Sequence, residues 1–430
     1  MAPPLRLGIA GLGTVGVGVL RLLQAHDQLI AERAGRALQV VAISARDRAR
    51  DRGVDLSAYR WLDDPRGLAA DREVDVVVEL IGGADGVALE LTQAALEAGK
   101  PVVTANKALL AHHGGRLARR AEASSSTIAF EAAVAGGIPI VKALREGLAG
   151  NRIGQVFGIL NGTCNYVLSA MRESARDFAP VLAEAQALGY AEADPSFDVD
   201  GIDAAHKLAL LAALAYGTPP AFEAVYREGI RHITAIDIAF AREMGYRIKL
   251  LGVARVTEAG LEQRVHPSMV RLGTPLAAVE GVENAVFVEG DQVGQTLFTG
   301  RGAGAGPTAS AVVADLVDLA KGHRPPTFGR AAGRLQPLPV APMERHVGAY
   351  YFRLMVVDRP GVLADVAACL RDHAVSIETV IQRARSEDEP VPIVFTTHET
   401  TEAKMTRALA RSAALDSVLE PPRMIRIEAL

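Results

Sequence analysis

The segment from Gly189 to Lys207 holds the densest group of chemically useful side chains in the sequence. Asp203 and Lys207 are four residues apart, so on a helix that Gly201 introduces they share one face. A lysine beside a carboxylate stays protonated and oriented, which suits it to donate a proton or to polarise a carbonyl group. We therefore take Asp203 and Lys207 as a candidate catalytic pair. Four further acids precede them: Glu192, Asp194, Asp198 and Asp200.

Three ordinary explanations compete for the same residues. A surface ion pair contributes only about 0.3–0.5 kcal/mol, but the apolar run Leu208–Leu214 that follows predicts partial burial. A calcium loop would place Ser196 at its first ligand position and Lys207 where a bidentate glutamate is required, which argues against it. Helix capping by Asp200 is compatible with either role for the pair.

A glycine-rich motif near the start of the chain predicts a dinucleotide site. It follows an expected strand, Leu5–Ala10, and opens an expected helix, Thr14–Ala25. Its glycines permit a tight turn and a close backbone approach to a pyrophosphate, which the helix N-terminus then attracts. We expect the cofactor to contact Gly11, Gly13, Thr14, Val15 and Gly16.

The end of the next expected strand, Gln39–Ile43, favours NADP over NAD. An NAD enzyme usually places a carboxylate there to bind the ribose hydroxyls, whereas this chain continues through Ser44 to Arg46 without one. Arg46 could pair with a 2′-phosphate. NAD stays possible, because a solvated loop arginine would also explain Arg46.

Two other residues could take part in the chemistry. Lys107 follows the expected strand Pro101–Thr104, and the carboxyl ends of parallel strands face the ligand crevice; a surface lysine at a helix start is the alternative. Cys164 could attack an aldehyde as a thiolate. That chemistry needs a nearby base, for which His206 is the candidate, and a buried structural cysteine is the other interpretation.

Composition restricts the class of protein. The chain has 430 residues, of which 49% are hydrophobic and 22% charged, with a formal net charge of −4. A disordered chain and phosphate-driven nucleic-acid binding are therefore not expected. No apolar run reaches the roughly 20 residues that a membrane span needs, and Cys164 and Cys369 suggest no disulfide framework. We expect a cytoplasmic protein.

The pattern of elements predicts an α/β protein of several domains. Residues 1–135 alternate apolar strands with helices, as in a Rossmann-type parallel sheet with helices on both faces. Residues 136–321 indicate an α+β catalytic and dimerisation domain. Its expected strands are Arg152–Leu160, Lys249–Val256, Gln263–Val270 and Ala285–Glu289, and a glycine-rich turn, Gly300–Gly306, leads to the helix Ser310–Lys321.

Residues 322–348 have many prolines and glycines and are interpreted as a linker. Residues 349–430 follow a β-α-β-β-α-β order, which predicts a ferredoxin-like unit. The expected elements are Tyr350–Val357, Val362–His373, Val375–Gln382, Pro392–Thr397, Glu402–Ala413 and Arg423–Glu428.

Several motifs, taken in order, resemble those of the homoserine dehydrogenases. The chain has Gly8-Ile-Ala-Gly-Leu-Gly-Thr-Val-Gly16, Val103-Thr-Ala-Asn-Lys107, Phe130-Glu-Ala-Ala-Val-Ala-Gly-Gly-Ile-Pro139 and Ile159-Leu-Asn-Gly-Thr-Cys-Asn-Tyr166. The most specific is Gly189-Tyr-Ala-Glu-Ala-Asp-Pro195, continued to Asp203 and Lys207. The resemblance implies NAD(P)-dependent interconversion of L-homoserine and L-aspartate 4-semialdehyde, on the route to threonine, methionine and isoleucine.

The resemblance also implies roles for individual residues. Lys207 matches the proton donor and Asp203 the group that orients it, while Lys107 matches a second lysine where cofactor and substrate meet. Glu192 and Asp198 are assigned to substrate binding. Gly304 is assigned to a cofactor contact that comes late in the sequence. A monovalent cation, expected to be sodium, is assigned to Glu131, Val134, Gly136 and Ile138.

The last unit resembles an ACT domain, in which the turn from Asp358 to Gly361 matches the segment where such domains bind an amino acid. The resemblance suggests feedback inhibition by threonine, and a domain that only dimerises is the alternative. Either role implies a homo-oligomer, which we expect to be a homodimer or a homotetramer. Two other functions stay open at this point. One is a phosphorylating semialdehyde dehydrogenase that uses Cys164 covalently, and the other is a catalytically silent amino-acid sensor.

Overall fold

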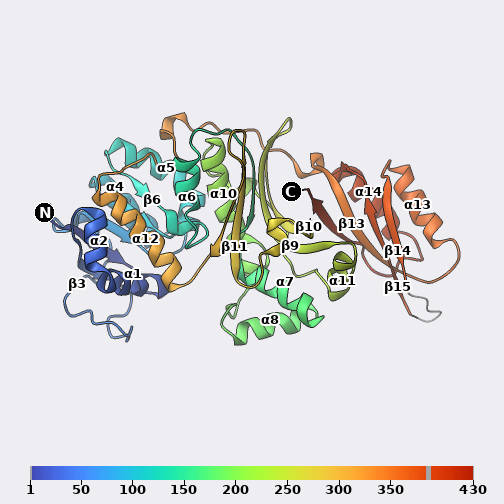
Figure 1. Ribbon diagram of the computed structural model, residues 1–430, viewed down its shortest axis with the longest axis horizontal. Helices are drawn as coiled ribbons and strands as arrows, with labels where there is room; N and C mark the ends of the chain where they lie inside the picture. Colours follow the sequence, from blue (N-terminus) through green and yellow to red (C-terminus); the bar gives the residue numbers. More distant parts are fainter. Residues whose placement is uncertain (1, 384–388, 430) are drawn as a thin grey trace.

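The computed structural model describes residues 2–383 and 389–429, and Figure 1 shows three parts along its longest axis. The N-terminal part is drawn in blue and teal, the central part in green and yellow, and the C-terminal part in orange and red. Residues 1, 384–388 and 430, which the expected first and last domains include, lie outside the described residues.

The N-terminal part confirms the expected parallel Rossmann-like sheet. Its strand order is β3-β2-β1-β4-β5-β6, and every neighbouring pair is parallel. Strand β1 and helix α1 have the expected bounds, because an apolar run and a glycine motif mark both ends of the turn between them. The elements are β1 Leu5–Ala10, α1 Thr14–Ala25, α2 Asp27–Ala34, β2 Leu38–Ser44, β3 Arg60–Trp61, α3 Gly67–Ala70, β4 Val76–Glu79, α4 Val87–Glu97, β5 Val102–Thr104, α5 Lys107–Ala123 and β6 Ile128–Ala129.

One helix returns to this sheet from far along the chain. Helix α12, Ala305–Ala320, packs against α1, and Gly18 allows this contact because a Cβ there would lie 2.7 Å from the Ala305 carbonyl oxygen. Figure 1 shows α12 among the blue and teal elements. The boundary at residue 135 stays a prediction, but the segment after it supplies a helix to the N-terminal part.

The central part is an antiparallel sheet with helices on one face. Its strands follow the order β12-β11-β7-β9-β10, and all these pairs are antiparallel. A mostly buried helix, α10, packs on β9, β10 and β7 and carries the candidate lysine. The elements are α6 Ile140–Lys142, β7 Ile153–Ile159, α7 Gly162–Ser174, α8 Phe178–Ala187, α9 Ser196–Val199, α10 Ile202–Tyr216, β8 Tyr226–Arg227, α11 Ala235–Glu243, β9 Tyr246–Thr257, β10 Gly260–Arg271, β11 Glu283–Gly290 and β12 Gly294–Arg301.

Two expectations for this region are wrong. The expected turn Gly300–Gly306 instead begins with the last two residues of β12, an exposed edge strand. Helix α12 begins at Ala305 rather than Ser310. Gly304 has φ +115°, which suits glycine just before the helix, and Pro307 is tolerated in the first turn, where its missing N–H is not needed.

The C-terminal part, which resembles an ACT domain, has the expected ferredoxin-like order. Strands β17, β13, β15 and β14 form its sheet, and α13 and α14 pack on each other. The bounds of α14 and β17 are as expected. The elements are β13 Val347–Val356, α13 Val362–Asp372, β14 Ile377–Gln382, β15 Val391–Thr397, β16 Thr400–Thr401, α14 Glu402–Ala413 and β17 Arg423–Glu428.

The central and C-terminal sheets join edge to edge. Strand β17 pairs in parallel with β10, which gives one continuous sheet of 11 strands. Two ion pairs cross this junction: the buried pair of Arg264 with Glu428, and that of buried Arg426 with partly exposed Glu228 at 3.0 Å. The sequence did not predict this pairing, since parallel pairing between distant segments has no local signal.

The expected linker, residues 322–348, is irregular but packed. Val340 forms an isolated parallel β-bridge with Leu261, and the backbone N–H of Ala332 donates to the Glu122 carboxylate at 2.7 Å. In the part of the chain that the structure describes, no helix is both long and apolar enough to cross a membrane.

Candidate active site

One buried carboxylate joins the two candidate lysines. Asp203 Oδ1 lies 2.7 Å from Lys107 Nζ, and Asp203 Oδ2 lies 2.7 Å from Lys207 Nζ. Lys207 also donates to the carbonyl oxygen of Leu160 at 2.7 Å. Lys107 comes from the Rossmann-like part and Lys207 from the central part, so Asp203 connects the two parts through opposite oxygens.

Burial and the neighbouring charges shift the pKa of each of these three groups to a different extent. Burial alone would raise the pKa of Asp203, but the ammonium groups of Lys207 and Lys107 hold it well below its ordinary value. Burial lowers the pKa of Lys207, and Asp203 opposes that effect only in part. For Lys107, burial also lowers the pKa, yet attraction to Asp203 outweighs it and the pKa is raised. Lys207 is therefore the better proton donor of the two.

A cavity of about 480 Å³ opens at this triad. Asp198 lines it and accepts hydrogen bonds from Thr163 Oγ1 at 3.0 Å and Asn161 Nδ2 at 2.8 Å. Its other lining residues come from both parts of the molecule and include Lys107, Lys207, Tyr190, Asn284, Arg301 and Gly304. The carboxylate and ammonium groups at one end suit a small zwitterionic substrate.

A chain of polar contacts positions Lys107 at the start of α5. The buried carboxylate of Glu79, at the end of β4, accepts from Thr104 Oγ1 at 2.6 Å. Thr104 Oγ1 in turn accepts from the backbone N–H of Asn106 at 2.9 Å, and the Asn106 side chain caps the helix by accepting from Leu109 N at 3.0 Å. Sequence reasoning missed Glu79, although its place at a strand end was a usable signal.

Glu192 lies outside the cavity wall. Its side chain is exposed, and its backbone carbonyl accepts from Gln186 Nε2 at 2.9 Å. Its charge nevertheless helps to raise the pKa of Lys107, after the larger effects of burial and of Asp203. Its role in substrate binding stays a prediction.

The structure disfavours covalent chemistry at Cys164. Burial raises the pKa of this thiol well above its ordinary value, and its Sγ lies 3.2 Å from the Asp198 carbonyl oxygen. The expected base, His206, instead stacks on Phe222 with ring centroids 4.1 Å apart. Burial, and after it His112, lowers the pKa of His206 to about 4.

The glycine loop after β1 has the shape that a pyrophosphate requires. A Cβ on Gly11, whose φ is +99°, would lie 2.4 Å from the Leu80 carbonyl oxygen, and one on Gly16 would lie 2.0 Å from the Gly11 carbonyl oxygen. A Cβ on Gly13 would meet nothing within 4 Å. Thr14 and Val15 begin α1, so unpaired backbone N–H groups face this open space.

Arginines surround the expected adenosine end of that loop. Arg46 is exposed beyond β2. The guanidinium carbons of Arg48 and Arg52 lie 5.9 and 5.7 Å from the ring centroid of Trp61, and Arg52 Nε donates to the Leu12 carbonyl oxygen at 3.2 Å. The sequence pattern singled out Arg46 but not the contacts of Arg48 and Arg52 with Trp61.

The expected cation ligands lie in one loop against the cavity. Glu131 is buried, and its two carboxylate oxygens accept from Val141 N and Lys142 N, both at 2.9 Å. Burial, followed by repulsion from Asp315, raises the pKa of Glu131 to about 7. A nearby cation would relieve that unfavourable charge.

The same loop supplies backbone oxygens. Val134, Gly136 and Ile138 follow Glu131, and Gly136 packs so closely on Gly302 that a Cβ would lie 2.4 Å from its carbonyl oxygen. Oxygen donors with one carboxylate fit a hard cation of single charge. Among the described residues, no group of three or more His, Cys, Asp or Glu side chains could hold a metal ion.

In the ACT domain, Gly361 caps α13 with φ +96°, and Asp358 precedes it in the turn after β13. A Cβ on Gly361 would meet nothing within 4 Å, so its backbone is open to a ligand.

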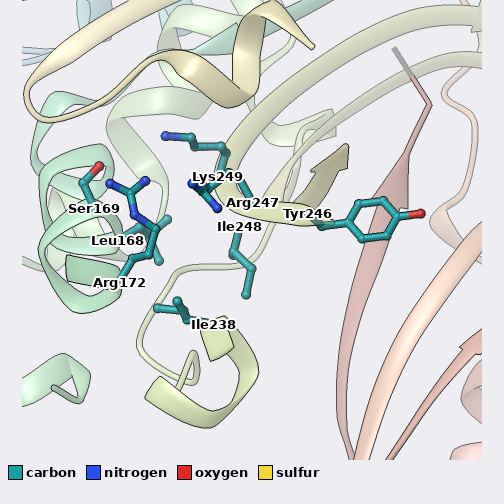
Figure 2. Close-up of a pocket in the computed structure, with 8 residues that line it drawn as sticks. All are labelled: Leu168, Ser169, Arg172, Ile238, Tyr246, Arg247, Ile248 and Lys249. Carbon is teal, nitrogen blue, oxygen red and sulfur yellow. The ribbon is translucent and has the colours of Figure 1, made fainter. Parts of the chain in front are cut away.

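A second cavity lies beside α7, α11 and β9, and has room for about one water molecule (Figure 2). The amine of Lys249 donates to Asn165 Oδ1 at 3.1 Å and to the Val279 carbonyl oxygen. Burial lowers the pKa of Lys249 to about 8. These contacts tie the loop before β11 to α7, and the cavity is too small for a substrate.

Three family models match the chain. Residues 11–131 match the NAD binding domain of homoserine dehydrogenase, residues 139–317 match homoserine dehydrogenase, and residues 350–413 match the ACT domain. The chain is 49% identical to a homoserine dehydrogenase of Pseudomonas aeruginosa over 99% of each chain. It is 48% identical to one of Neisseria gonorrhoeae, again over 99% of each chain.

Solved structures agree with these matches. A homoserine dehydrogenase from Thiobacillus denitrificans superposes with a TM-score of 0.94 at 47% identity, over 99% of this chain and 98% of that one. A hyperthermophilic archaeal homoserine dehydrogenase in complex with NADPH superposes with a TM-score of 0.63 at 27% identity, over 73% of this chain and 97% of that one.

Proposed function

The chain belongs to the homoserine dehydrogenase family of NAD(P)-dependent oxidoreductases, and on that premise we propose how its residues perform the reaction. The substrates are L-homoserine and L-aspartate 4-semialdehyde, which interconvert by transfer of one hydride and one proton. The observation that supports this assignment most is Asp203, which contacts Lys107 and Lys207 through opposite oxygens at the mouth of the cavity.

Lys207 donates the proton. A nicotinamide held by the glycine loop would supply the hydride to the aldehyde carbon, and the proton for the aldehyde oxygen comes from Lys207. Lys207 is protonated because Asp203 lies 2.7 Å away, yet burial lowers its pKa and makes the proton easier to release. Lys107, whose pKa is raised, stays charged and stabilises the same oxygen electrostatically.

Asp198 and Glu192 bind the ammonium group of the amino acid. Asp198 lines the cavity, and its carboxylate already accepts from Asn161 and Thr163, so its direction is set before substrate arrives. Glu192 adds negative charge at the exposed side. When the substrate is held at both ends, the reaction becomes effectively unimolecular. This positioning accounts for much of the rate enhancement over the reaction in solution.

NADP is the preferred cofactor, and Gly11, Gly13, Thr14, Val15, Gly16 and Gly304 form its cradle. Arg46 supplies a positive charge beyond β2 where an NAD enzyme would carry an acid. Arg48 and Arg52 beside Trp61 add to that charge. The archaeal relative solved with NADPH supports the same preference.

The Glu131 carboxylate and the carbonyl oxygens of Val134, Gly136 and Ile138 would hold a monovalent cation, sodium. The pKa of Glu131, raised to about 7, supports a cation there, because a bound positive charge would compensate the buried carboxylate. The residues that would hold the cation belong to the loop that packs on Gly302, which lines the cavity.

The ACT domain binds an amino acid, which we propose is threonine, at the turn from Asp358 to Gly361. The enzyme is a homodimer or a homotetramer. Inhibition by threonine would fit a reaction on the route to threonine, methionine and isoleucine.

Nicotinamide absorbance tests the proposal. Purified protein with L-homoserine should reduce NADP faster than NAD, and threonine should slow the reaction. Turnover that requires phosphate and disappears in Cys164→Ala would instead favour the covalent chemistry. Nucleotide binding without turnover would favour an amino-acid sensor.

A further inference from the structure

Asn161 occupies the junction between β7 and α7, and its contacts with two distant acids are not revealed by sequence spacing. It is 5% exposed. Its side-chain Oδ1 accepts from the backbone N–H of Cys164 at 2.8 Å and so caps α7. Its Nδ2 donates to Asp198 Oδ1 at 2.8 Å and to Asp203 Oδ2 at 2.9 Å. Both donors and the acceptor of one amide are therefore engaged.

These bonds restrict how Asp203 can turn. Asp203 Oδ2 accepts from both Asn161 and Lys207, while Oδ1 faces Lys107. Rotation of the carboxylate would break the Asn161 bond and exchange the oxygens between the lysines. Because Asn161 Oδ1 also caps α7, the amide cannot follow such a rotation without losing its hydrogen bond from the backbone N–H of Cys164.

Asn161 also separates two carboxylates. Asp198 and Asp203 would repel each other across the cavity wall, and the amide places one N–H group on each of them. Only a side chain with two donors on one atom can serve both acids. An aspartate has almost the same shape but offers no donor when ionised.

We propose that Asn161 is a positioning residue of the dehydrogenase reaction, which orients Asp203 toward the two lysines and Asp198 toward the substrate ammonium group. This inference rests on the proposed roles of Asp203 and Lys207. Asn161 lines the same cavity, and its amide acts on the reaction through these two carboxylates.

Asn161→Asp tests this role, because it keeps the helix cap and removes the two donors. The charged groups that face the position are Asp198 from α9, Asp203 and Lys207 from α10 and, through Asp203, Lys107 from α5. Cys164 on α7 is a neutral thiol, and its backbone N–H donates to the Asn161 side chain. The charges of Asp200 and Glu192 act on Cys164 and on Lys107, respectively.

At neutral pH the introduced carboxylate repels Asp198 and Asp203. We expect kcat to fall by about 10²-fold, within the range that positioned proton transfer contributes. At lower pH the introduced group takes up a proton and can donate one hydrogen bond, so the activity of the variant relative to the wild type should rise as pH falls. A merely structural role would give no such reversal.

Asn165→Asp is the matched control, since Asn165 is a buried amide one turn further along α7. Its Nδ2 donates to the carbonyl oxygens of Val279 and Glu283, both at 3.2 Å, and not to the acids of the cavity. It should lower the thermal midpoint and leave kcat within about threefold. Asn161→Ser, which keeps a capping hydroxyl with one donor, should fold and show an intermediate kcat.

The proposal is overturned if Asn161→Asp and Asn161→Ser keep wild-type kcat at neutral pH, or if their loss follows thermal stability as in the control without the pH reversal. The Asp203→Asn variant distinguishes a failure of the Asn161 proposal from a failure of the proposed chemistry. Should Asp203→Asn remain active, the roles of Asp203 and Lys207 are wrong. Should it be inactive while the Asn161 variants are active, only the role of Asn161 is wrong.

Discussion

Asp203→Asn removes the charge that both lysines contact while keeping the size of the side chain. The Asp203 side chain is 4% exposed and that of Lys207 9%, so solvent cannot replace the lost partner. Breaking a buried pair by removing one charge costs about 3–5 kcal/mol. If that cost falls on the protonated state of Lys207, kcat for aldehyde reduction should fall by about 10²–10⁴-fold.

The Asp203→Asn substitution should also shift the pH dependence of aldehyde reduction in a defined direction. Asp203 raises the pKa of Lys207 against the effect of burial. Without that carboxylate the pKa of Lys207 should fall further, so the lysine loses its proton at lower pH. The alkaline limb of the rate of aldehyde reduction should therefore move to lower pH.

The assay is oxidation of the reduced cofactor by L-aspartate 4-semialdehyde across a pH series. Asp237→Asn is the matched control, because Asp237 is a buried carboxylate that accepts from Arg353 at 2.8 Å and Tyr351 at 2.9 Å, at the contact with the ACT domain. It should reduce stability and leave the alkaline limb unchanged. A folded Asp203→Asn variant with kcat within about threefold of the wild type would refute the reasoning.

Three other outcomes follow. Because the pKa of Glu131 is raised to about 7, the folded protein holds a proton that the unfolded chain releases above about pH 4.3. Thermal stability in choline buffer should therefore fall as pH rises toward 7, and sodium should reverse that fall. Glu131→Gln should abolish the sodium effect and reduce the pH effect, which Asp315 still supports because burial raises its pKa to about 6. Arg46→Ala should raise KM for NADP by about tenfold and leave KM for NAD nearly unchanged, as kinetics with both cofactors will show; equal changes would contradict a 2′-phosphate contact. Cys164→Ala should lose about 1–2 kcal/mol of stability in denaturant titration and keep kcat within about threefold; abolished turnover would point to covalent chemistry.

Sequence patterns predicted the elements that are determined by residues close together in the chain. The apolar strand β1 and helix α1 were predicted to the residue, because the glycine motif fixes the turn between them. Strand β12 was missed because it is an exposed edge strand with little apolar alternation. The start of α12 was placed too late because Gly304 and Pro307 suggest a turn until the helix cap is seen.

The same distinction applies to the site. Asp203 and Lys207 were found because a spacing of four residues on a helix puts them side by side. Lys107 was found from its place after a parallel strand, but its contact with Asp203 joins two separate parts of the chain. Asn161 was only part of a motif, since its bonds to Asp198 and Asp203 cross 37 and 42 residues and depend on how α7 and α10 pack.

The most direct test of the central claim compares Lys207→Met with the wild type. Reduction of NADP by L-homoserine is followed by absorbance, and cofactor affinity is measured separately by fluorescence titration. We predict that the variant binds NADP with a Kd within about twofold of the wild type while kcat falls by about 10³-fold or more. A variant that binds NADP and keeps kcat within about tenfold would contradict the assignment of Lys207 as proton donor.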